Sequence, residues 1–167
     1  QNVNPTVDPI RDLEIIETEM MLADLESIQK RLEKNNKKNV DEEQLKILEI
    51  ALDCINNSKD IQILHNQFEK KKLMQSSLLS LKPKIFVCNV DEASVQNGNQ
   101  YTEDFIKKFG EKNTLIVSAD IENQINQLEN DEKKNYMEMI GLKVTGLNML
   151  IQKGYNILEL DTYFTSG

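Results

Sequence analysis

Two short apolar runs, each followed by polar residues, constrain the fold of this chain more than any other feature. Residues 85–88 (Ile-Phe-Val-Cys) stop at Asn89, and residues 115–117 (Leu-Ile-Val) stop at residues 118–119 (Ser-Ala). Runs of this length are typical of strands that are buried on both faces. A helical candidate, residues 101–109, lies between them. Strand, helix and strand in this order predict a parallel βαβ unit and an α/β fold.

The polar ends of these strands form a candidate site, because open α/β sheets bind ligands at the carboxyl ends of their parallel strands. The amide of Asn89 can donate and accept hydrogen bonds at a purine edge, and the carboxylate of Glu92 can accept them from ring N–H groups. Asn is also common as a cap in the turn that follows a strand. The residues alone leave both roles of Asn89 open.

The motif of a phosphate-binding loop is absent from the sequence. P-loop enzymes hold phosphates and place Mg²⁺ with Gly-x-x-x-x-Gly-Lys-Ser/Thr. None of the 6 glycines begins this pattern, and no Asp-x-x-Gly element occurs. The chain therefore carries no phosphate- or Mg²⁺-binding motif of this kind.

The first half of the chain has the periodicity of amphipathic helices. Asp12 can cap a helix that ends near Lys34, along which apolar residues recur every three or four positions. Polar residues 35–39 separate it from a second such helix over 45–55, and a less regular helical segment covers 66–79. This pattern predicts an antiparallel helical hairpin. Its simplest role is packing, and the alternative is that its basic tip contacts a partner.

Further local signals predict where the elements begin and end. A capping box of Asp41 with Gln44 starts the second helix. After the second strand, Asp120 can cap another helix. Residues 145–154 predict a helix that begins at a threonine and ends at a glycine, and residues 157–160 have the composition of a strand that begins there.

The two strand ends also match the motif pair that recognises the base in P-loop GTPase-like domains. The first motif is usually Asn-Lys-x-Asp, whereas residues 89–92 are Asn-Val-Asp-Glu, and Ser-Ala at 118–119 matches the second. This departure, together with residues 7–12 (Val-Asp-Pro-Ile-Arg-Asp), 22–26 (Leu-Ala-Asp-Leu-Glu) and the ending 160–167, makes the chain resemble the YchF/Obg-like ATPase family.

The resemblance implies the C-terminal half of a P-loop NTPase G domain, with the helical hairpin inserted as a coiled-coil domain. Residues 1–11 are then a remnant of the G domain and residues 12–81 the insert. Residues 82–156 carry the base-recognition motifs, and residues 157–167 lead to a TGS domain. The chain is then expected to be an internal fragment that lacks the phosphate loop and is inactive by itself.

The resemblance also assigns the base site. Asn89 holds the purine edge, Val90 lies against the base plane, and Glu92 ends the motif as an acceptor or a steric limit. The backbone at residues 118–119 offers N–H groups. The full set of implied site residues is Asn89, Val90, Glu92, Ser118, Ala119 and Asp120.

The implied function is that of an ATP-preferring, or ATP- and GTP-using, hydrolase that needs Mg²⁺ and associates with ribosomes in the cytoplasm. The net charge of −8 argues against strong direct binding of nucleic acid by this piece. No apolar run is long enough to span a bilayer, so no membrane partner is expected. The alternative function is a coiled-coil interaction module that binds no nucleotide. Nucleotide titration distinguishes the two.

Overall fold

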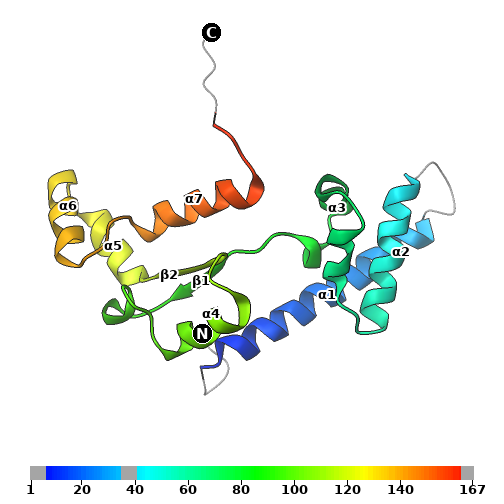
Figure 1. Ribbon diagram of the computed structural model, residues 1–167, viewed down its shortest axis with the longest axis horizontal. Helices are drawn as coiled ribbons and strands as arrows, with labels where there is room; N and C mark the ends of the chain where they lie inside the picture. Colours follow the sequence, from blue (N-terminus) through cyan, green and yellow to red (C-terminus); the bar gives the residue numbers. More distant parts are fainter. Residues whose placement is uncertain (1–6, 35–40, 163–167) are drawn as a thin grey trace, which may run out of the picture. The chain divides into compact units, whose positions relative to one another are not determined.

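The computed structural model describes residues 7–34 and 41–162, and the chain divides into two compact units that meet between Lys82 and Pro83. The first unit is helical, and the second contains a small parallel sheet (Figure 1). The predicted polar turn at 35–39 and the last residues of the predicted junction, 163–167, lie outside the described residues.

The first helix, α1 (Pro9–Lys34), begins four residues earlier than predicted. Asp8 takes the capping role that was predicted for Asp12, since its carboxylate accepts from the Arg11 N–H at 3.1 Å. Pro9 at the first helical position explains the shift, because its fixed φ suits a helix start and its missing N–H costs nothing there. The predicted apolar stripe is only partly correct: Ile28 is buried, whereas Ile16 is 51% exposed.

The second helix, α2 (Glu42–Asn56), starts at Asp41 as predicted, but not through a capping box. The Asp41 carboxylate accepts from the Glu43 N–H at 3.0 Å. The side chain of Gln44 donates instead to the Lys72 carbonyl at 2.8 Å, because a third helix packs beside this turn. The buried face of α2 consists of Ile47, Leu48, Ala51 and Cys54.

The prediction of one helix over 66–79 is wrong, because the chain forms three short pieces between residues 61 and 81. They are η2 (Ile61–Asn66), α3 (Lys70–Ser76) and η3 (Leu79–Leu81). Ser77 ends α3 with a left-handed φ of 59°, which stops a continuous helix. The pieces η2 and α3 pack on α2, and η3 packs on α1, so the unit has a shared core rather than a seam between two helices. The core residues are Ile28, Ile47, Leu48, Ala51, Cys54, Ile61, Leu64, Leu73, Leu78 and Leu81.

The second unit contains the predicted βαβ element. Strand β1 (Phe86–Asn89) pairs in parallel with β2 (Thr114–Val117), and α4 (Gln100–Phe109) connects them. Asn99 and Thr102 form a capping box that starts α4. The ring of Phe105 in α4 lies edge-on to that of Phe86 in β1, with centroids 5.3 Å apart, so α4 packs on the sheet.

The prediction that β1 is buried on both faces is wrong, since Val87 is 47% exposed. The physical reason is the size of the sheet. Two strands are hydrogen-bonded among the described residues, and the helix α7 (Gly146–Leu158) packs against β2 rather than β1. The face on which Val87 lies is therefore left partly uncovered.

Three helices and one turn complete the second unit: η4 (Glu92–Ser94), α5 (Ala119–Gln127), α6 (Asn130–Met139) and α7. Thr145 caps α7 as predicted, but the helix continues through Gly154 to Leu158. The strand predicted over 157–160 is therefore wrong. Gly154 has ordinary helical geometry, and the helix ends at Glu159, whose φ is 54°.

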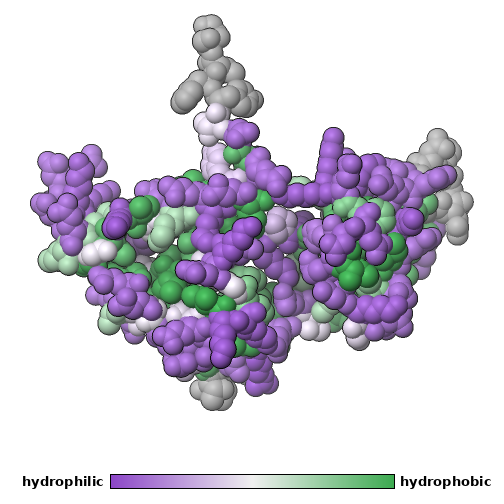
Figure 2. Space-filling view, viewed as in Figure 1, coloured by the Kyte–Doolittle hydropathy of each residue, from purple (hydrophilic) through white to green (hydrophobic). Residues whose placement is uncertain are grey.

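Apolar side chains remain at the surface of α7, including Leu147, Ile151 and Leu158, which are 46–52% exposed. Figure 2 shows that most of the visible surface is hydrophilic, with apolar residues appearing between hydrophilic ones. Within the described ranges, 7–34 and 41–162, every helix is too short or too polar to cross a membrane.

Candidate functional site

The register of the sheet brings the two predicted strand ends together. Asn89 is paired with Val117, so the residue after each strand lies at the same edge. The backbone N–H of Val90 donates to the Val117 carbonyl at 2.9 Å, which extends the ladder by one bond. The Asn89 side chain then spans the gap: its Oδ1 accepts from the backbone N–H of Ala119 at 2.9 Å.

This bond fixes the orientation of the Asn89 amide. Because the Ala119 N–H is a donor, the atom that faces it must be the oxygen, and the Nδ2 amine must point elsewhere. The Asn89 side chain is exposed, and no hydrogen bond from its amine to a described residue is found. Asn89 therefore offers donors at the strand end while its oxygen holds the neighbouring loop.

The residues after Asn89 form a tight turn. Asp91, which the sequence did not single out, caps η4 by accepting from the Ser94 N–H at 2.9 Å. Val90 is 9% exposed, so little of its side chain is available at the surface. Burial raises the pKa of the Cys88 thiol, which precedes Asn89, so this thiol carries no charge at neutral pH.

Glu92 lies at the start of η4 and is exposed. Its Oε1 accepts from the side-chain amine of Gln124 in α5 at 2.5 Å. The carbonyl oxygen of the same Gln124 amide accepts from the hydroxyl of Tyr136 in α6. The carboxylate that ends the first motif is thus the last acceptor in a chain of hydrogen bonds from three elements.

The second motif begins α5. Ser118 is the N-cap residue, is 1% exposed, and has a buried hydroxyl without a hydrogen-bond partner among the described residues. Asp120 lies inside the first turn of α5, so its predicted capping role is wrong: the extended backbone of Ser118 places the cap two residues earlier. Ala119 and Asp120 are both exposed.

Glu122 holds this loop against the rest of the unit, and sequence reasoning missed it. Its two carboxylate oxygens accept from the backbone N–H groups of Gly146 at 2.6 Å and Leu147 at 3.3 Å, at the N-terminus of α7. A carboxylate there satisfies free backbone donors and complements the helix dipole. A Cβ at position 146 would lie 2.7 Å from Val117 Cγ1, so this close approach requires glycine.

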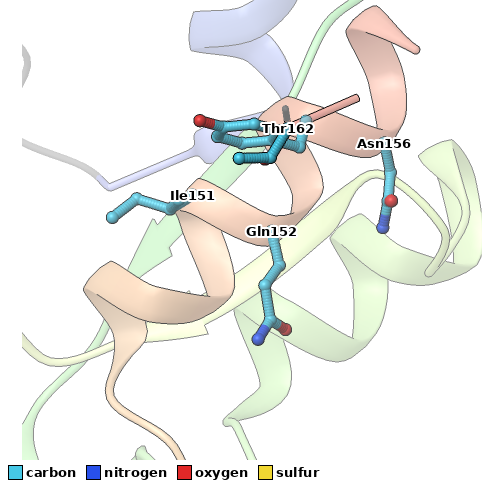
Figure 3. Close-up of a pocket in the computed structure, with 5 residues that line it drawn as sticks. Ile151, Gln152, Asn156 and Thr162 are labelled. Carbon is cyan, nitrogen blue, oxygen red and sulfur yellow. The ribbon is translucent and has the colours of Figure 1, made fainter. Parts of the chain in front are cut away.

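An open hollow of about 420 Å³ lies along α7, apart from the predicted site residues. Figure 3 shows that Gln152 and Asn156 extend from the same side of α7, whereas Ile151 points in another direction and Thr162 lies beyond the helix. Tyr155 completes the lining. No residue of the two motifs contributes to this hollow, so it is separate from the candidate base site.

Metal ligation is not supported within the described part of the chain. There, no group of three or more His, Cys, Asp or Glu side chains is arranged to hold an ion. Three carboxylates at or near the site have partners: Asp91 caps its own turn, Glu92 accepts from Gln124, and Glu122 accepts from the start of α7, whereas Asp120 is exposed. The chemistry of the site is therefore that of hydrogen-bond donors and acceptors.

Comparison with known proteins gives consistent matches along nearly the whole chain. The chain is 34% identical over 176 residues to the ribosome-binding ATPase YchF of Bacillus subtilis, covering 99% of this chain and 48% of that protein. It is 35% identical over 170 residues to the YchF of Haemophilus ducreyi, covering 96% of this chain and 46% of that protein. The chain thus spans about half the length of the curated relatives it matches. No family model matches.

A solved structure agrees with these matches. The Schizosaccharomyces pombe YchF GTPase superposes with a TM-score of 0.74 at 25% identity, covering 100% of this chain and 48% of that one. The α-rich fold with its small parallel sheet, and the relatives it matches, place the chain among homologues of proteins named as nucleotide hydrolases. The chain is thus similar to YchF proteins along nearly its whole length, and the resemblance drawn from the sequence motifs is confirmed.

Proposed function

We propose that this chain carries the base-recognition part of a P-loop nucleoside triphosphate hydrolase of the YchF type. The observation that carries the proposal is the 2.9 Å bond from the Ala119 N–H to Asn89 Oδ1. It joins the ends of two parallel strands and leaves the amine of an exposed Asn89 as a donor. The N7 atom of a purine is an acceptor in both adenine and guanine. Asn89 therefore suits a purine without choosing between the two.

We further propose that the choice of base depends on Glu92, and that ATP is bound at least as well as GTP. In an Asn-x-x-Asp site the carboxylate accepts from the guanine N1–H and N2 amine, which adenine lacks. An acceptor that the bound base buries without a partner costs about 1–3 kcal/mol. Glu92 has one more methylene than Asp, so its oxygens occupy a different place and the penalty against adenine is removed.

The phosphates and Mg²⁺ are proposed to bind to another part of a longer polypeptide. Two observations support this. The chain has no phosphate-loop motif, and it matches only about half the length of its relatives. Phosphate and Mg²⁺ contacts stabilise the transition state of this reaction, so the chain by itself is expected to hydrolyse neither ATP nor GTP. The names of the relatives extend the proposal to ribosome binding, and hence to a cytoplasmic protein.

The test is titration of the full-length protein with fluorescent ATP and GTP analogues. Saturable binding is expected, and Asn89→Ala should lower the affinity for both nucleotides. Asn123→Ala, an exposed Asn on α5, is the matched control and should leave both unchanged. The double variant that combines Glu92→Asp with Val90→Lys should shift the nucleotide preference towards GTP.

Two results would contradict the proposal. Unchanged binding in Asn89→Ala would remove its basis, and a wild type that already favours GTP tenfold would refute the role of Glu92. Absence of saturable binding would favour the interaction module without nucleotide. That alternative is not favoured at present, because the relatives are named ATPases and the solved neighbour a GTPase.

A further inference from the structure

Three side chains from separate elements form a directed chain of hydrogen bonds that ends at the proposed base site. The Tyr136 hydroxyl in α6 donates to Gln124 Oε1, and Gln124 Nε2 in α5 donates to Glu92 Oε1 at 2.5 Å. The direction follows from the chemistry of the ends. An ionised carboxylate accepts only, so the Gln124 amine must face Glu92 and its oxygen must face the phenol.

From this geometry we propose that Gln124, held by Tyr136, selects adenine over guanine nucleotides by occupying one oxygen of Glu92. The proposal rests on the base-recognition function proposed above. A guanine edge presents two donors, N1–H and the N2 amine, which pair with a carboxylate through both of its oxygens. The longer side chain of Glu92 moves its oxygens from the place that Asp would give them, and Gln124 holds Oε1 there, so guanine must displace the amide or give up one bond. Adenine has neither donor and loses nothing.

The location of these residues argues against a purely structural role. Glu92 and Gln124 are exposed, and hydrogen bonds between exposed groups add little to stability because water replaces them. Helix α5 is anchored on its other faces by the buried Ile121 and Ile125 and by the contact of Glu122 with α7. The Gln124 side chain is therefore not needed to hold its helix in place, and its removal should change the choice of base rather than the fold.

The experiment measures competition of ATP, GTP and ITP against a fluorescent ATP analogue on the full-length protein. Gln124→Ala should raise the affinity for GTP relative to ATP by roughly 2- to 12-fold, the range of one hydrogen bond. Tyr136→Phe, which only releases Gln124, should give a smaller shift in the same direction. ITP has the N1–H but no N2 amine, so it should gain less than GTP. Gln127→Ala on the same helix is the control, with no shift expected.

A double-mutant cycle tests whether Gln124 acts through Glu92. In a Glu92→Ala background, Gln124→Ala should leave the ATP-to-GTP ratio unchanged. A shift of equal size in that background would overturn the proposal. Far-UV circular dichroism checks that each variant is folded. If Gln124→Ala does not fold, Tyr136→Phe tests the proposal instead, and the affinity for GTP relative to ATP should again rise.

The outcomes separate this inference from the function on which it rests. If Asn89→Ala leaves the binding of both nucleotides unchanged, the base-recognition function fails. If Asn89→Ala weakens both nucleotides while Gln124→Ala and Tyr136→Phe keep the wild-type ratio, the function stands and the role of Gln124 is refuted.

Discussion

Replacement of Asp24 by Ala should destabilise the helical unit more than any change at its surface. Asp24 is 2% exposed, and its carboxylate accepts from the backbone N–H groups of Leu79 at 2.7 Å and Ser80 at 2.8 Å. A hydrogen bond to a charged group contributes about 1.5–3 kcal/mol. Water can partly replace the bond to the half-buried Leu79 N–H, but not the bond to the buried Ser80 N–H. We therefore expect a loss of about 2–5 kcal/mol in the free energy of unfolding.

The assay is urea denaturation followed by circular dichroism at the helical band. A lower midpoint with an unchanged slope would show lost stability rather than an altered denatured state. Asp24→Asn keeps one acceptor oxygen and should lose about half as much. Glu26→Ala on the same helix, where Glu26 is exposed and pairs with Lys30, is the control and should give no measurable change. An Asp24→Ala midpoint equal to wild type would refute the reasoning.

Three further predictions concern the stability of the two units. Leu48→Ala should cost about 2–5 kcal/mol in urea melts because Leu48 is 1% exposed, and Leu52→Ala should cost less because Leu52 is only partly buried. Lys72 donates a hydrogen bond to Asp41 and so lowers the pKa of Asp41 below its ordinary 3.8. The stabilising effect is then complete above pH 3.8 and lost as the pH falls through the lowered value, so Lys72→Met should flatten a plot of Tm against pH in that window. Gly146→Ala should cost about 1–3 kcal/mol in thermal melts, because its Cβ would crowd β2. An unchanged Tm for Gly146→Ala would show that the crowding is relieved.

The sequence predicted both strands to within one residue, because each apolar run is short and ends in polar residues. The helix starts at Asp41 and Thr145 were also correct, since a capping side chain bonds to backbone only two or three residues away. The start of α1 was misplaced because two aspartates precede the apolar stripe, and the pattern does not decide between them. Gly154 was taken as a helix end although a glycine can also lie inside a helix, as it does here.

The residues that the sequence did not identify are those whose partners lie far along the chain. Asp24 would ordinarily be assigned to solvent, but its two donors are 55 and 56 residues away. The Glu122 carboxylate accepts from a backbone N–H group that lies 24 residues further along the chain. The Gln124 amine donates to Glu92, which lies 32 residues earlier. Helical periodicity carries no information about such contacts. The motif therefore predicts that Asn89 lies at a strand end, but it does not predict which distant side chains stabilise the site.

The most direct test of base recognition by this chain pairs Asn89→Ala with 7-deaza-ATP, which lacks the N7 acceptor. Affinities of ATP and 7-deaza-ATP are measured by competition on full-length wild type and on Asn89→Ala. If the Asn89 amine donates to N7, wild type should bind 7-deaza-ATP roughly 2- to 12-fold more weakly than ATP. Asn89→Ala should bind both equally, at the weaker level. Equal affinities for the two nucleotides in wild type would contradict the assignment of Asn89 to the purine edge.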